Sequence, residues 1–108
     1  MAARLFYEEK RITVFLEGEI DHHSAAILRA GIDDAIYVNR PSELVLDFGG
    51  ITFMDSSGIG LVMGRYKIMK SLGGRIILTS LSGTNEKLMK LAGLEKLENI
   101  EFRESALL

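Results

Sequence analysis

The sequence contains no cysteine, only one proline, no long hydrophobic run and no excess of basic residues. The missing cysteines exclude disulfides and thiolate metal sites. No apolar run approaches the roughly 20 residues that span a bilayer, and the N-terminus has no basic-then-apolar leader, so we expect a cytoplasmic protein. The formal net charge of −2 provides no basic field and argues against a nucleic-acid partner.

The remaining composition is that of a globular protein. Hydrophobic residues make up 47% of the chain and charged residues 26%. A chain of 108 residues can bury about two-thirds of its unfolded surface in one core. No internal repeat, linker or low-complexity segment divides it, so we expect one domain over residues 1–108.

Hydrophobic periodicity predicts strands that alternate with helices. Period-two or buried runs predict five strands, at 5–7, 12–16, 43–48, 75–79 and 100–102. Helical spacing predicts a helix after residue 21, one from residue 58 to Gly73, one up to Gly93, and the start of a last helix at 104–108. The order β-β-α-β-α-β-α-β predicts an α/β domain: a mixed, mostly parallel sheet of about five strands with helices packed on it.

Turn and capping residues set the expected boundaries. Gly18 is predicted to end the second strand, and Asp21 or Ser24 to cap the first helix. Pro41 stops that helix, because proline restricts the residue before it. We expect Gly49–Gly50 to loosen the chain after the third strand. Ser82 or Thr84 is expected to cap the third helix.

One stretch carries more polar chemistry than its position needs. The segment 52–60 starts apolar, continues as Asp55-Ser56-Ser57-Gly58 and runs into a helical pattern, which places Ser56 and Ser57 at a helix start. From the residues alone, helix capping is the simpler interpretation. Two hydroxyls and an acid exceed what one cap requires, so a serine that accepts a phosphate or attacks an electrophile stays open as the alternative.

The glycines after these serines permit a second interpretation. Gly58-Ile59-Gly60 with Gly64 suggests a nucleotide-binding loop, but that site also needs an acid at the end of the next strand, where this chain has Thr79-Ser80. Gly60 and Gly64 lie one turn apart on one helix face. We therefore expect a smooth surface where a strand or a partner comes close, and no bound cofactor.

The residue types present could in principle form a metal site from the two histidines or a hydrolase site from a histidine and a serine. His22 and His23 are the only histidines, they are adjacent, and zinc needs at least a third ligand. A serine hydrolase could combine Ser56 with one histidine and an aspartate. The G-x-S-x-G pattern is missing, however, and 108 residues leave little room for a substrate cleft. We expect no metal and no catalytic residues.

The segment Gly18-Glu19-Ile20-Asp21 is a strand end that turns into a helix. By itself it needs no explanation beyond turn and capping chemistry. In α/β sheets, however, functional groups gather beyond the carboxyl ends of the strands. Asp21 and Ser56 both follow strands and both open helices, so they are candidates to lie side by side.

Together these segments resemble a known family. The run 53–60 followed by Gly64-Arg65-Tyr66-Lys67 resembles the signature of the STAS domain of anti-sigma factor antagonists, most closely its anti-sigma-F branch in sporulation. The first loop, 18–23, and the late helix end, 91–94, are similar as well. Two features differ from the family: Ser82-Gly83-Thr84 stands where relatives have Ser-Pro, and relatives continue through a longer final helix.

The resemblance implies a non-enzymatic switch. The unphosphorylated antagonist binds an anti-sigma factor that is also a serine kinase and so frees the sigma factor. That kinase, which supplies the ATP, phosphorylates the first serine after the aspartate, here Ser56, and a metal-dependent serine phosphatase reverses this. The implied partner-binding residues are Asp21, His22, Asp55, Ser57, Gly58, Ile59, Gly60 and Leu61. General stress-response antagonists and ligand-sensing STAS domains share the fold and stay as alternatives.

Overall fold

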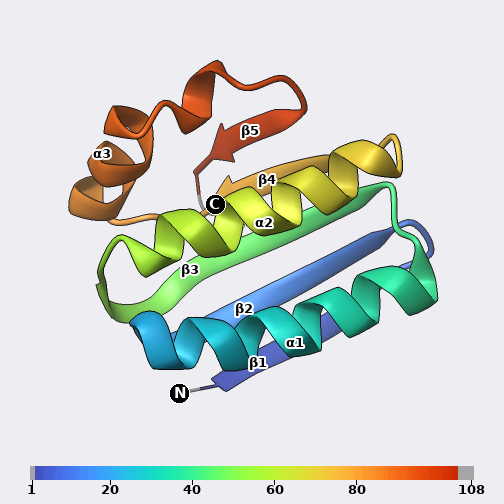
Figure 1. Cartoon of the computed structure of the whole chain (residues 1–108), viewed down its shortest axis with the longest axis horizontal. Coiled ribbons are helices and arrows are strands. Elements are labelled where there is room, and N and C mark those ends of the chain that lie inside the picture. The colour runs from blue at the N-terminus through green and yellow to red at the C-terminus, as the bar shows by residue number, and fades with distance from the viewer. Residues whose placement is uncertain (1, 105–108) are drawn as a thin grey trace.

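A single five-stranded sheet organises the molecule (Figure 1). The computed structural model describes residues 2–104. The strands lie in sequence order, β1 antiparallel to β2 and the others parallel, which confirms the predicted fold class and element order. The strand bounds are β1 (Ala2–Tyr7), β2 (Arg11–Ile20), β3 (Glu43–Met54), β4 (Arg75–Thr79) and β5 (Ile100–Arg103).

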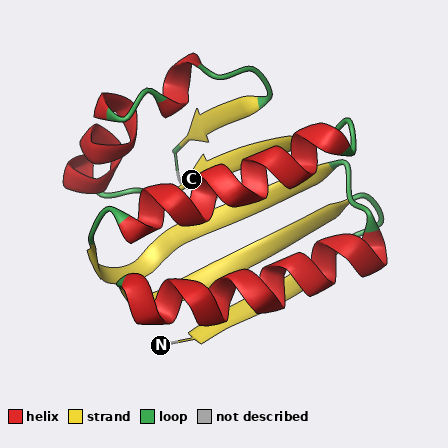
Figure 2. Cartoon of the chain, in the orientation of Figure 1, coloured by secondary structure: helices red, strands yellow, loops and turns green. Residues whose placement is uncertain are grey.

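The two long helices lie on one face of this sheet (Figure 2). They are α1 (His22–Asn39) and α2 (Ser57–Ser71); a third helix, α3 (Gly83–Leu91), and a short 3-10 helix, η1 (Leu94–Lys96), lie near β5. Crossovers between neighbouring parallel strands are right-handed, so a sheet whose strands follow sequence order receives its helices on the same face. The starts of α1 and α2 consequently lie at the same end of the molecule, the left-hand end of Figure 1.

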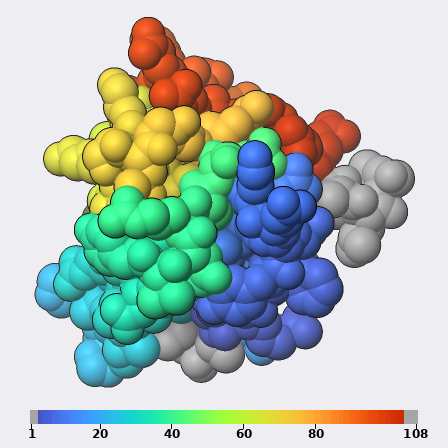
Figure 3. Space-filling view, turned by 90° about the vertical axis from the view of Figure 1, so that its right-hand side faces the viewer, coloured from blue at the N-terminus to red at the C-terminus, as the bar shows by residue number. Residues whose placement is uncertain are grey.

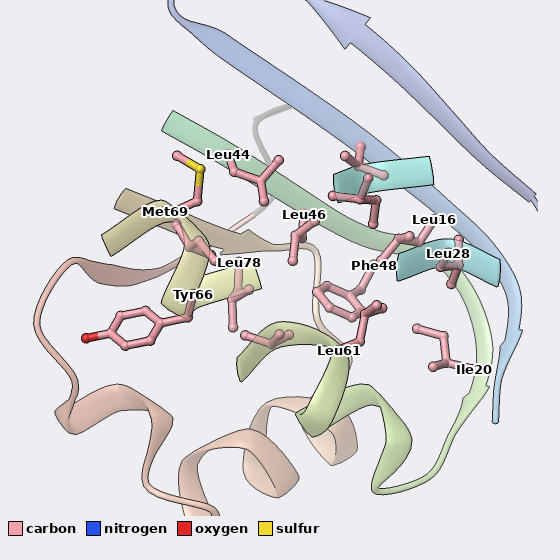
Figure 4. Packing of buried hydrophobic residues seen from close by; sticks show 14 of the residues in the cluster. Leu16, Ile20, Leu28, Leu44, Leu46, Phe48, Leu61, Tyr66, Met69 and Leu78 are labelled. Atoms are coloured by element: carbon pink, nitrogen blue, oxygen red, sulfur yellow. The ribbon is translucent and has the colours of Figure 1, made fainter. Parts of the chain in front are cut away.

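The core lies between this face of the sheet and the helices (Figure 4). Alternate residues of β2 point into it, and the predicted apolar stripe of α1 covers them. Side chains from β2, β3, β4 and α2 interlock there, with Phe48 and Leu61 close together toward the end where the helices begin. The most completely buried side chains include Ile12, Leu16, Ile20, Ile32, Ile36, Leu44, Leu46, Met69, Ile76 and Leu78.

The opposite face of the sheet carries a row of alternating charges. Arg11, Glu43 and Arg75 are direct neighbours on β2, β3 and β4, and their side chains point away from the core because the next residue of each strand is buried in it. Arg11 Nη2 lies 2.7 Å from Glu43 Oε1, Arg75 Nε lies 4.0 Å from Glu43 Oε2, and Arg75 also pairs with Glu101 of β5. We call these four residues the charge row.

Two predicted strand ends are wrong. The second strand does not end at Gly18 but continues to Ile20. The register with β3 shifts between Gly18 and Glu19, and Gly18 adopts φ 93°, which lets the strand continue through this shift. The chain does not loosen at Gly49–Gly50 either, and β3 continues to Met54. A Cβ on Gly50 would lie 2.8 Å from the Leu16 carbonyl oxygen, so glycine permits this close approach of β2 and β3.

The first strand begins at Ala2, three residues before its predicted start, while the helix boundaries predicted from capping residues are confirmed. The C-cap of α1 is Arg40, just before Pro41; Gly73 follows α2 with φ 74°; and the Ser82 hydroxyl caps α3. Figure 3 shows the end of the molecule where α1 and α2 finish beside the β1–β2 turn. The helix predicted from residue 104 falls almost entirely on 105–108, outside the described residues. Within residues 2–104, no helix is long and apolar enough to cross a membrane.

Candidate functional site

The two strand-to-helix junctions lie side by side at the carboxyl end of the sheet. Ile20 and Met54, the last residues of β2 and β3, are direct neighbours in the parallel ladder. The Asp55 amide then donates a hydrogen bond to the Ile20 carbonyl oxygen at 3.2 Å. The structure therefore brings together the loop of Asp21 and the loop of Ser56, as the sequence suggested.

The β2–α1 junction uses its serine for structure. Asp21 caps α1, with its Oδ1 accepting a 2.8 Å hydrogen bond from the Ser24 amide. In return Ser24 Oγ accepts from the Asp21 amide at 3.0 Å, and it donates to the Glu19 carbonyl oxygen at 2.8 Å. Both predicted caps thus work together as a capping box. The bond from the Ser24 amide is the main reason that the pKa of Asp21 is lowered.

The β3–α2 junction leaves its serine free. Asp55 Oδ1 accepts a 2.7 Å hydrogen bond from the Ser57 amide and so provides the cap. Ser56 occupies the N-cap position, but its backbone is already helical (φ −62°, ψ −14°) and its side chain makes no capping bond. Its side chain is exposed, whereas Ser57 is half-buried. An acid beside an exposed, uncommitted hydroxyl is an arrangement that can accept a phosphate.

The residues after the serines differ in what they offer to a partner. A Cβ on Gly58 would lie 2.3 Å from Met54 Sδ, so this glycine is explained by packing inside the molecule. Gly60 is exposed with open space around it, and Ile59 is half-buried. Leu61 is only 3% exposed and belongs to the core. Of this run, Gly60 is the residue most open to a partner.

Within residues 2–104, the two histidines join neither a metal-binding cluster nor a serine side chain. His22 and His23 are both exposed on the first turn of α1. Among the described residues, no group of three or more histidine, aspartate or glutamate side chains is placed to hold a metal ion. Among the side-chain hydrogen bonds within residues 2–104, none joins a histidine to Ser56 or Ser57. The base that would activate a hydrolase serine is therefore not in contact with it.

A hollow of about 260 Å³ opens between the first turns of α1 and α2. We call it the interhelix hollow. The residues that line it are His22, Ala25, Ala26, Arg29, Ser57, Gly60, Leu61 and Arg65. Small residues of both helices keep it open, and its polar lining includes two guanidinium groups. Ser57, the second of the two serines, forms part of its lining.

Sequence reasoning missed a buried ion pair between the helices. Arg65 Nε lies 2.7 Å from Asp33 Oδ1, and the two side chains are 5% and 23% exposed. Burial lowers the pKa of the Arg65 guanidinium, and the charge of Asp33 opposes that effect. The signal was available, because Arg65 falls at helical spacing between Leu61 and Met69, both buried.

Comparison with known proteins identifies the class. Residues 6–106 match the STAS domain family, and the chain belongs to that family. It is 39% identical over 83 residues to an anti-sigma F factor antagonist of Lysinibacillus sphaericus, a match that covers 77% of this chain and 71% of that protein. It is 32% identical over 92 residues to the anti-sigma-B factor antagonist of Bacillus subtilis, covering 85% and 83%.

Solved structures give the same assignment. The anti-sigma factor antagonist SpoIIAA in its unphosphorylated form is 30% identical, with a TM-score of 0.78 over 98% of this chain and 91% of that chain. The Bacillus cell fate determinant SpoIIAA in the phosphorylated form is 32% identical, with a TM-score of 0.77 over 97% and 92%. The chain is therefore a STAS domain related to both the sigma-F and the sigma-B antagonists.

Proposed function

We propose that this protein is an anti-sigma factor antagonist of sporulation whose binding is switched off by phosphorylation of Ser56. The unphosphorylated form binds an anti-sigma factor that is also a serine kinase, and the sigma factor is released. The protein itself is not an enzyme. The observation that carries the proposal is the free, exposed hydroxyl of Ser56 beside a capping Asp55, in a chain of this family.

The physics of the switch favours a local effect. A phosphate on Ser56 adds about −1.5 to −2 charges. The start of α2 favours a negative group by about 0.3–1 kcal/mol. Asp55 and Asp21 repel it by a comparable amount, because all these groups lie at the same edge of the sheet. With opposing effects of similar size the fold does not change, and the phosphate blocks binding by its bulk and by repulsion of an acidic partner surface.

The proposed partner face is formed by the two junctions. Asp21 and His22 contribute from the first, and Asp55 from the second. The start of α2 contributes Ser57, Ile59 and Gly60, of which Gly60 offers an open backbone surface. Gly58 and Leu61, which the resemblance also implied, are buried and support this face from within. The kinase brings its own ATP, and a serine phosphatase restores the active form.

The decisive experiment is incubation with a candidate kinase and ATP, followed by mass mapping of the phosphate. We expect one phosphate, on Ser56. Ser56→Ala abolishes incorporation, while the matched variant Ser57→Ala keeps some, because Ser56 is exposed and Ser57 is half-buried. Phosphate found on Ser57 in the wild-type chain contradicts the assignment. Ser56→Asp should bind the kinase weakly, although one carboxylate imitates a phosphate poorly.

A second experiment tests the local character of the switch. Backbone amide chemical shifts of the unmodified and phosphorylated forms are compared by NMR. We expect changes at residues 19–23 and 54–61 and little elsewhere. Large changes in β4, β5 or α3 would show that the phosphate rearranges the fold, and the proposal of local blocking would be abandoned.

A second candidate is antagonism in a general stress-response system. The relation to the anti-sigma-B factor antagonist, 32% identical over 85% of this chain, favours it. The site chemistry is the same in both cases, so only the partner differs. A pull-down with the purified protein against candidate anti-sigma-F and anti-sigma-B factors separates the two. Preferential retention of the anti-sigma-B factor would replace the sporulation assignment.

A further inference from the structure

The interhelix hollow is lined by positive side chains and by no negative one. Arg29 and Arg65 both line it, and none of the lining residues is a carboxylate. The charge of Arg65 is matched by Asp33, which pairs with it from α1. Arg29, which is exposed, forms no ion pair with any of residues 2–104. Arg29 also contributes to the lowered pKa of Arg65, because the two like charges lie near each other.

Arg65 retains donor capacity in this hollow. Its side chain is 5% exposed, its Nε lies 2.7 Å from Asp33 Oδ1, and its Nη2 donates to Asp33 Oδ2 at 3.5 Å. Its Nη1 donates to the Leu61 carbonyl oxygen at 3.2 Å. Because each Nη carries two N–H groups, the guanidinium keeps one further donor on each for an additional acceptor.

The two acids at the helix starts form hydrogen bonds of their own. Asp21 accepts from the Ser24 amide and Asp55 from the Ser57 amide, so both carboxylates cap their own helices. The first amides of α2 are occupied as well, since Gly58, Ile59 and Gly60 donate to the carbonyl oxygens of Asp55 or Ser56. Any attraction for an anion therefore comes from the guanidinium groups, with the Ser57 side chain and His22 at the rim.

We infer that the interhelix hollow is a binding site for a single phosphate-type oxyanion, held by Arg29 and Arg65. Arginine presents planar donors that match the oxygens of phosphate. The volume of about 260 Å³ suits one small tetrahedral anion with its water. The anion has two possible sources, free inorganic phosphate or the phosphoryl group of Ser56, whose neighbour Ser57 lines the hollow. The second source rests on the proposed function.

The test is a titration of the unmodified, 15N-labelled protein with inorganic phosphate. Sodium chloride at equal ionic strength is the reference, because exposed charges are screened by salt. We expect saturable shifts of the Arg29 and Arg65 side-chain Nε–H signals and of amides 57–61. The test requires neither kinase nor modification, so its failure leaves the proposed function intact.

Two variants distinguish specific binding of phosphate in the hollow from nonspecific attraction of phosphate to positive charge. Arg29→Gln should weaken phosphate binding about tenfold, the scale of one charge-assisted hydrogen bond. Lys67→Gln removes the same charge from an exposed position of α2 that does not line the hollow and should leave the affinity unchanged. Shifts that do not saturate, or that weaken equally in both variants, overturn the inference.

A final titration identifies the source of the bound anion. In the protein phosphorylated on Ser56, free phosphate should no longer shift the Arg29 signal if the phosphoryl group already fills the hollow. The Arg29 and Arg65 signals should then resemble those of the phosphate-saturated unmodified protein. If free phosphate still binds to the modified protein with unchanged affinity, the ligand of the site is the free ion.

Discussion

The β2–α1 and β3–α2 junctions follow neighbouring strands and begin neighbouring helices, yet they use their serines in opposite ways. Ser24 is buried and its hydroxyl joins the Asp21 amide to the Glu19 carbonyl oxygen. Ser56 is exposed and its side chain makes no capping bond, because Asp55 already caps α2. An aspartate caps each helix, so the capping residue does not distinguish the two serines. The spacing does: Ser24 lies three residues after Asp21, where its hydroxyl reaches back to the Asp21 amide, whereas Ser56 directly follows Asp55 and its side chain makes no such bond.

The largest difference between the junctions should be in stability. Ser24→Ala removes a buried hydroxyl that serves one amide and one carbonyl oxygen, and should lower the free energy of unfolding by about 1–3 kcal/mol. Ser56→Ala should change it by less than about 0.5 kcal/mol, as for other exposed side chains without partners. Urea denaturation of both variants measures this. Equal losses would mean that Ser56 has a structural role after all.

The two glycines of the second junction should also respond in opposite directions. Gly58→Ala places a methyl group against Met54 and should cost about 1–3 kcal/mol of unfolding free energy. Gly60→Ala has open space and should stabilise α2 by about 0.5–1 kcal/mol. Thermal denaturation of the pair is the measurement. A stabilised Gly58→Ala protein would show that the Met54 side chain moves aside without cost.

Removing the cap of the second junction should have an intermediate effect. Asp55→Ala takes away the acceptor of the Ser57 amide and should lower the free energy of unfolding by about 1 kcal/mol. Adding Ser56→Ala to this variant tests whether the serine replaces the lost cap. An extra loss in the double variant, absent in Ser56→Ala alone, indicates that it does. Chemical denaturation of the four proteins completes this double-mutant cycle.

The smallest expected effect is on pH dependence at the first junction. The pKa of Asp21 is lower in the folded than in the unfolded protein, mainly through the bond from the Ser24 amide. Its charge therefore stabilises the fold above the unfolded pKa of about 4, and this contribution is lost as the pH falls through the folded pKa. Asp21→Asn should flatten the stability profile in that acidic range. An unchanged slope contradicts the role given to the bond.

Local patterns in the sequence were sufficient for most of the fold. The alternation of Ile12, Val14 and Leu16 and the stripe of α1 predicted which faces are buried, because burial follows the period of each element. Pro41, Gly73 and Gly93 also fell where they were expected, since proline restricts the residue before it and the two glycines adopt the positive φ that follows a helix end.

The features that local patterns could not predict depend on contacts between elements. From the sequence alone, a glycine inside a strand cannot be told from a glycine in a loop. Only the close approach of the Leu16 backbone to Gly50 shows that Gly50 belongs to a strand. The partner of Arg65 could not be predicted because it comes from another helix, α1. Whether Asp55 or Ser56 caps α2 could not be predicted either, because it depends on the backbone angles of Ser56. The interhelix hollow arises only when both helices are in place.

The charge row on the open face of the sheet bears on how the strands find their alignment. A parallel strand that slips by two residues keeps the same side chains on each face, so burial of apolar residues detects such an error poorly. Such a slip of β3 would separate Glu43 from both Arg11 and Arg75 at the same time. Each exposed pair contributes only about 0.2–1 kcal/mol. Together they favour the native register in a sheet whose parallel strands are joined through distant segments of the chain.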